Sequence, residues 1–229
     1  MQKFSKFLVS ALLAGTFLTG CGGAEESTTG SEPQEEPKPA EQKDKKVSKP
    51  KKDEAGNTIL DEVGQTHESE AGKAELMKIK KINETVDIAP LKVTVQDIKV
   101  IKLSDVDPTF AEDLALQMDG EAELLKKGFS YVQVKYTAEN TADQNVEWYD
   151  LMNVITDKGE QIDGQLKDFL IDDADLDSEF IGKVKKEYVD SFVLKDGDIS
   201  KAKLVFGNTM NADTYEDITG EQTVEYTLD

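Results

Sequence analysis

The segment VQVKYTA at residues 132–138 alternates apolar and polar side chains at every position. Side chains of a β-strand point to opposite faces in turn, so this period of two predicts a strand with one buried face. Residues 91–96 and 223–228 repeat the alternation. The apolar phase slips at residues 98–100, which predicts either a β-bulge or a strand that changes sheets. The chain is therefore expected to build sheets from strands of this kind.

Turn residues separate further short strands. Asp196-Gly197 lies between residues 188–195 and 201–206, and Asp157-Lys158-Gly159 follows residues 151–156. Both turns are typical of β-hairpins. Many short strands without a regular strand–helix alternation favour an all-β antiparallel β-sandwich.

One short helical insertion is expected at residues 107–127. Asp107 can cap a helix, Pro108 suits the first helical position, and Gly128 can end the insertion. Between them, apolar residues recur every four positions. We expect this segment to lie against one end of the sandwich.

The strand–turn–strand pattern also carries a family resemblance. VxVxYTxxNT at residues 132–141, then DL at 150–151 and DxG at 157–159, resembles the immunoglobulin-like domain of many Gram-positive lipoproteins, a domain related to a secreted mycobacterial immunoprotective antigen. The resemblance covers residues 76–229. It implies an immunoglobulin-like β-sandwich with no established catalytic residues.

The first residues have the pattern of an exported lipoprotein. Two lysines precede apolar residues 7–17, a run too short to cross about 30 Å of hydrocarbon as a helix. Leu18-Thr19-Gly20-Cys21 resembles the lipobox of bacterial lipoproteins, in which the cysteine receives a diacylglyceryl group and the signal peptide, here residues 1–20, is removed. Since Cys21 is the only cysteine, we expect a lipid anchor there and a chain on the extracellular side of the cell membrane.

Residues 21–75 are predicted to be a disordered tether, and residues 76–229 the folded domain. The tether has few large aliphatic side chains and is rich in Glu, Lys, Pro and Ser, so it cannot bury enough surface to offset chain entropy. Residues 38–52 are rich in lysine. They either contact anionic lipid or wall polymer, or form a solvated linker.

The composition excludes several classes of function. The chain has 47 acidic and 27 basic residues, a net charge of −20, and every basic residue is lysine. Arginine is the usual residue for bidentate recognition of phosphate and guanine, so nucleic-acid binding is not expected. The negative field favours basic protein partners or cations.

No catalytic constellation is evident, and the chain is predicted not to be an enzyme. His67 is the only histidine and lies in the predicted tether, which excludes histidine-dependent catalysis and histidine-ligated zinc from the folded domain. A hydrolase that uses two carboxylates is the remaining enzymatic alternative, but no acid is flanked well enough to be nominated.

The acidic loop at residues 172–179, with Asp168 just before it, is a candidate calcium site. Calcium binds six to eight oxygen ligands from flexible loops, and Asp173, Asp175, Asp177 and Glu179 alternate along this segment. The pattern does not match an EF-hand. The alternative is a solvated acidic loop that protects a sheet edge.

Glu147-Trp148-Tyr149-Asp150 is a candidate ligand-binding site, since adjacent aromatic and acidic side chains can bind a sugar ring. In the alternative, Trp148 and Tyr149 point to opposite faces of a strand, one in the core and one on the rim.

Together these observations predict a lipid-anchored, non-catalytic binding module for an envelope or extracellular protein. An alternative function of a different class is a structural component of the envelope that binds calcium or wall glycan. No cofactor other than calcium is expected.

Overall fold

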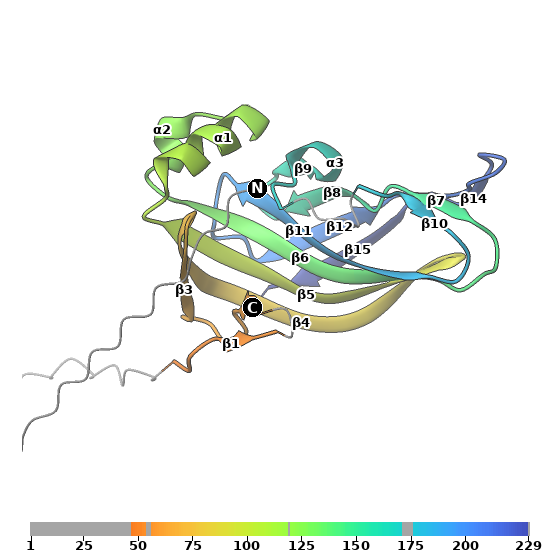
Figure 1. The fold of residues 1–229 in the computed structure, drawn as a ribbon, viewed down its shortest axis with the longest axis horizontal. Helices are drawn as coiled ribbons and strands as arrows, with labels where there is room; N and C mark the ends of the chain where they lie inside the picture. The colour runs from red at the N-terminus through yellow and green to blue at the C-terminus, as the bar shows by residue number, and fades with distance from the viewer. Residues whose placement is uncertain (1–46, 54–55, 119, 171–175, 229) are drawn as a thin grey trace, which may run out of the picture. The chain divides into compact units, whose positions relative to one another are not determined.

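The computed structural model describes residues 47–53, 56–118, 120–170 and 176–228. Every strand pairing among these residues is antiparallel. In Figure 1 the strands form stacked layers, and the helices lie together along one side of them. The predicted all-β antiparallel sandwich with a short helical insertion is confirmed.

The described strands form four sheets. The largest has the order β11 (Lys185–Leu194), β6 (Phe129–Asn140), β5 (Leu91–Ser104), β4 (Gly72–Ile88) and β3 (Thr66–Ser69). Facing it is a sheet with the order β15 (Gln222–Thr227), β12 (Lys201–Phe206), β8 (Leu151–Thr156) and β9 (Gln161–Asp163). The third sheet has the order β10 (Glu179–Phe180), β7 (Val146–Trp148), β13 (Thr209–Asn211) and β14 (Asp217–Thr219). The fourth sheet consists of β1 (Lys51–Lys52) and β2 (Thr58–Ile59). The helices are α1 (Pro108–Met118), α2 (Ala122–Leu125) and α3 (Gly164–Lys167).

The main core lies between the large sheets. Val132, Val134 and Tyr136 of β6 are fully buried in it, as the alternation of this strand predicts. Tyr136 stacks on Tyr188 of β11 with ring centroids 4.8 Å apart. Tyr136 also donates a 2.8 Å hydrogen bond to the buried Asp190. Burial and the nearby Asp190 carboxylate raise the pKa of Tyr136 well above its ordinary value.

A second core lies on the opposite face of the five-stranded sheet, under the helical insertion. Phe129 and Tyr131 point away from the main core because they occupy the other phase of β6. They pack with Ile101 and Leu103 of β5 and with Leu114 of α1. The two faces of one strand thus serve two different cores.

The predicted bulge in β5 is confirmed. The register between β5 and β6 shifts between Val95 and Asp97. Because the bulge adds one residue, Ile98 and Val100 return to the main core beyond it.

The predicted boundary at residue 76 is wrong. Thr66–Ser69 pairs with residues 72–75 of β4, and Leu60 is buried in the second core. Main-chain hydrogen bonds hold this exposed edge strand, so it needs few apolar residues. Its polar composition therefore led to the wrong prediction that it is disordered. Residues 21–46 of the predicted tether lie outside the described residues.

One of the two predicted hairpins is also wrong. The turn at 157–159 joins β8 to β9, which pair as predicted. The turn at Asp196-Gly197 instead carries the chain from β11 in one sheet to β12 in the other. Asp196 accepts a 2.9 Å hydrogen bond from the main chain of Asp198, a local turn that does not determine which strands pair.

Candidate binding cleft

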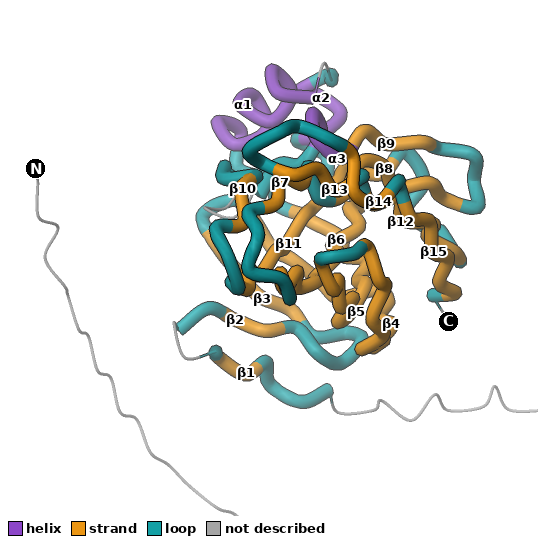
Figure 2. Tube along the Cα trace, turned by 90° about the vertical axis from the view of Figure 1, so that its right-hand side faces the viewer, coloured by secondary structure: helices purple, strands orange, loops and turns teal. Residues whose placement is uncertain are grey.

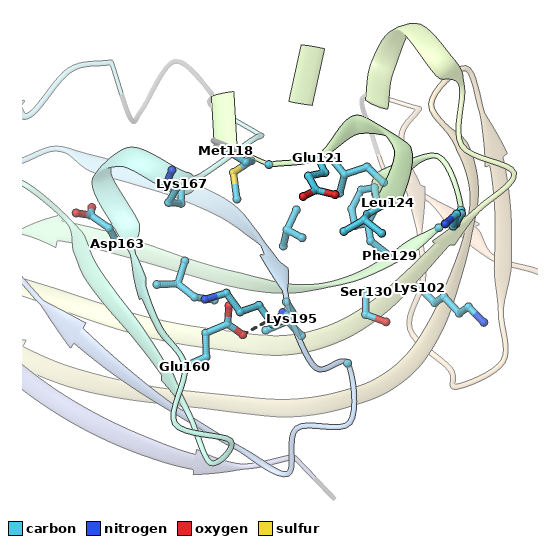
Figure 3. A pocket seen from close by; sticks show the side chains of 18 of the residues that line it. Lys102, Met118, Glu121, Leu124, Phe129, Ser130, Glu160, Asp163, Lys167 and Lys195 are labelled. Atoms are coloured by element: carbon cyan, nitrogen blue, oxygen red, sulfur yellow. Dashed lines mark hydrogen bonds between the residues drawn. The ribbon is translucent and has the colours of Figure 1, made fainter. Parts of the chain in front are cut away.

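A cleft of about 930 Å³ lies between the helical insertion and the β9–α3 segment. Figure 3 shows the residues of the two walls, with Glu121 and Leu124 on one wall and Asp163 and Lys167 on the other. The end of β11 forms part of its floor. The volume falls within the range of ligand-binding cavities.

The helical wall depends on the cap and stop residues. The Asp107 carboxylate accepts hydrogen bonds from the main-chain N–H groups of Thr109 and Phe110, at 2.9 and 3.0 Å, which confirms the predicted cap. At the other end, Gly128 has φ = 100°. A Cβ atom there would lie 2.8 Å from the main-chain oxygen of Leu103, so glycine is required where the chain turns from α2 into β6.

The opposite wall depends on a second cap. The Asp163 carboxylate accepts hydrogen bonds from the main chain of Gln165 and Leu166, at 3.0 and 3.1 Å, and so begins α3 directly after β9. A Cβ atom on Gly164 would lie only 1.8 Å from the main-chain oxygen of Leu151. The close approach of α3 to β8 therefore requires glycine at this position.

The lining combines an apolar surface with separate charges. Its apolar side chains come from both helices of the insertion and from three strands: Met118, Leu124, Leu125, Phe129, Ile162, Val193 and Leu194. Its charged side chains are Lys102, Lys127, Lys167, Lys195, Glu121, Glu160 and Asp163. Lysines therefore outnumber acids in the lining, although the whole chain carries a charge of −20.

The acids of the lining are partly engaged with the main chain. Glu160 accepts a 3.1 Å hydrogen bond from the main-chain N–H of Lys195, which Figure 3 marks with a dashed line. Asp163 is used as the cap of α3. Within the described residues, no ion pair involves Lys102, Lys127 or Lys195, so their ammonium groups are available to an anionic group of a ligand.

The predicted Trp148–Tyr149 platform does not form. The Trp148 side chain is buried in the main core, and its indole N–H donates a 3.0 Å hydrogen bond to the main-chain oxygen of Gly207. Tyr149 is exposed, and the negative charge of Glu147 raises the pKa of its hydroxyl. Adjacent residues pointing to opposite faces explain the difference, and only Tyr149 can reach a ligand.

The predicted calcium ligands are only partly described. Asp173 and Asp175 lie outside the described residues. Asp177 forms a 3.0 Å ion pair with Lys186, whose hydrogen bond lowers the pKa of this carboxyl group. Glu179 begins β10, paired with Glu147 of β7. Among the described residues, no three side chains are grouped as metal ligands, and calcium binding stays a prediction.

The other predicted functional residues lie away from the cleft. Cys21 is outside the described residues. His67 lies in the exposed edge strand β3 and does not line the cleft. Within the described ranges, no helix has the length and apolar character needed to cross a bilayer.

The sequence did not indicate the cleft. Its lining residues come from five separate stretches of chain between Lys102 and Gly197, and no single stretch has an unusual pattern. The helical insertion and the hairpin at residues 151–162 were predicted, but the sequence did not predict that they form two walls of one cleft.

Comparison with solved structures yields distant likenesses of the fold. The chain matches no family model and no curated protein. A crystal structure of a functionally unknown protein from Listeria monocytogenes EGD-e is similar, with 10% sequence identity and a TM-score of 0.47. The alignment covers 69% of this chain and 87% of the Listeria chain.

Proposed function

We propose that this chain is a surface lipoprotein, anchored through a diacylglyceryl group on Cys21, whose folded unit binds an envelope or extracellular protein without catalysing a reaction. Leu18-Thr19-Gly20-Cys21 supports the anchor and the extracellular location. The resemblance at residues 129–163 supports a place among immunoglobulin-like lipoprotein domains.

The observation that carries the binding role is the cleft itself. It combines apolar lining side chains with four lysines. In binding sites the apolar groups supply affinity and the few polar groups fix the orientation of the ligand. Leu124 on its wall is 57% exposed. A bound partner would cover this side chain together with the apolar lining of the cleft.

The anchor is tested by detergent phase partitioning of the full chain with a C-terminal tag, expressed in a Gram-positive host. The chain is expected in the detergent phase, with mass spectrometry identifying a lipidated Cys21 as its first residue. Cys21→Ala should move to the aqueous phase. An unmodified Cys21, or partitioning that Cys21→Ala does not alter, would overturn the anchor.

Binding is tested with a photo-reactive phenylalanine derivative placed at residue 124 of the anchored chain in intact cells. A matched chain carries the same group at residue 116 of α1, whose leucine is 82% exposed and does not line the cleft. We expect one discrete protein to be captured from residue 124 only, and to bind the purified chain afterwards. Equal capture at both positions, or none, would contradict the cleft as the binding surface.

A further inference from the structure

The electrostatic character of the cleft differs from that of the rest of the molecule. Lys102 of β5, Lys127 before β6, Lys167 of α3 and Lys195 after β11 approach the cleft from four different elements. At physiological ionic strength the screening length is about 8 Å, so a group inside the cleft experiences these four lysines and the three lining acids more than the distant acids of the chain. The lining has one more lysine than acids, whereas the whole chain has 20 more acids than bases.

The neighbouring residue Lys126 forms the ion pairs that Lys127 does not form within the described residues. Its ammonium group pairs with Glu112 and Glu123, both at 2.9 Å, and these contacts raise its pKa. Lys127 is the next residue in the chain, is exposed, and lines the cleft. Within the described residues it takes part in no such pair, in a chain with 20 more acids than bases.

Exposed leucines also lie on the elements that form the two walls of the cleft. Leu125 and Phe129 are buried in the floor, whereas Leu124 on the wall is 57% exposed. Leu166 of α3, next to the lining residue Lys167, is 69% exposed. A small molecule enclosed in the cavity would leave these leucines in water, whereas a segment of a protein can cover them.

We infer that the cleft binds a segment of a protein partner in which acidic side chains flank an apolar centre. This inference rests on the proposed function and specifies the chemistry of the partner. The apolar centre packs on Leu124 and Phe129, and the flanking carboxylates pair with Lys127 on one side and Lys195 on the other. The acidic composition of the whole chain favours a basic partner. At the cleft, the lysines favour an acidic segment instead.

The experiment is a selection of random twelve-residue peptides displayed on phage against the full chain, purified in mild detergent. Enriched peptides are expected to carry Asp or Glu on both sides of apolar residues. The double variant Lys127→Glu/Lys195→Glu should weaken their binding at least tenfold. A parallel selection on this variant should enrich Lys or Arg at the flanking positions.

Lys185→Glu is the matched control, because this lysine is exposed at the far end of β11 and does not line the cleft. It should leave the affinity of the enriched peptides unchanged. The inference is overturned if the enriched peptides are basic, if the charge reversal has no effect, or if none is enriched while a fluorescent long-chain carboxylate binds in the cleft. A protein captured from residue 124 that lacks acidic–apolar segments would refute this inference and leave the proposed function standing.

Discussion

The main-chain N–H of Lys195 donates a 3.1 Å hydrogen bond to the side chain of Glu160, joining the end of β11 to the start of β9. These strands belong to opposite sheets. Both residues line the cleft, so this contact holds its floor to one of its walls.

Replacing Glu160 by Ala should therefore loosen the floor. A single hydrogen bond of this kind contributes about 0.5–1.5 kcal/mol, so exchange of the Lys195 amide hydrogen should become roughly three- to tenfold faster. Glu160→Gln keeps a carbonyl acceptor and should stay close to the unaltered protein. The measurement is amide hydrogen exchange by NMR, and equal rates in all three proteins would refute the contact.

Gly164→Ala should destabilise the wall formed by α3. The added Cβ atom would lie 1.8 Å from the main-chain oxygen of Leu151, so the backbone must shift. Overpacking of this kind costs about 1–3 kcal/mol. Gly220→Ala is the control because a Cβ atom there meets nothing within 4 Å. Urea unfolding measures both, and an equal change in the two variants would argue against the tight α3–β8 approach.

Trp148 and Tyr149 should respond very differently to truncation. Trp148→Ala removes a fully buried ring and should cost about 3–5 kcal/mol of unfolding free energy. Tyr149→Ala, at an exposed ring, should change it by less than about 0.5 kcal/mol.

If Trp148→Ala does not fold, fluorescence of the unaltered protein provides the test. Trp148 is the only tryptophan, so its emission should be blue-shifted in the native state, resist quenching by acrylamide, and move to the red on unfolding. Strong quenching of the native protein would show that Trp148 is outside the core.

Asp157 should make stability depend on acid pH. Its carboxylate accepts hydrogen bonds from the hydroxyl and main chain of Ser200 and from the main chain of Lys201, which lower its pKa from 3.8 to about 2. A pKa lower in the folded state stabilises that state above pH 4, and the contribution disappears as the pH falls from about 4 to 2. The difference in unfolding free energy between the protein and Asp157→Asn should therefore be largest above pH 4 and shrink on acidification.

Ser200→Ala tests the cause of that shift. It removes the largest contribution, so an NMR titration should find the pKa of Asp157 raised from about 2 toward 3.8. A pKa that does not move in this variant would show that the Ser200 hydroxyl is not responsible.

Much of the fold could be predicted because local patterns directly reflect local structure. The alternation at residues 132–138 places Tyr136 in the core, and Asp107 caps its helix as expected. The two errors concern pairing. Thr66–Ser69 is held by main-chain bonds to β4, and Asp196-Gly197 connects two sheets. The sequence of a segment does not show which distant strand it pairs with, so neither error could be avoided from the local pattern.

Local sequence patterns are enough to identify the alternating strands, such as residues 132–138, and the start of the helical insertion. The composition alone shows that the chain is strongly acidic and has no arginine. These properties depend on neighbouring residues or on composition. The burial of Trp148 beside the exposed Tyr149 depends on the tertiary structure, and so does the meeting of Lys127, Lys195 and Leu124 at one cleft. Figure 2 shows the helices gathered beside β8 and β9. That arrangement results from packing between strands and helices that are far apart in the chain. The spacing of apolar residues within one segment does not predict such contacts.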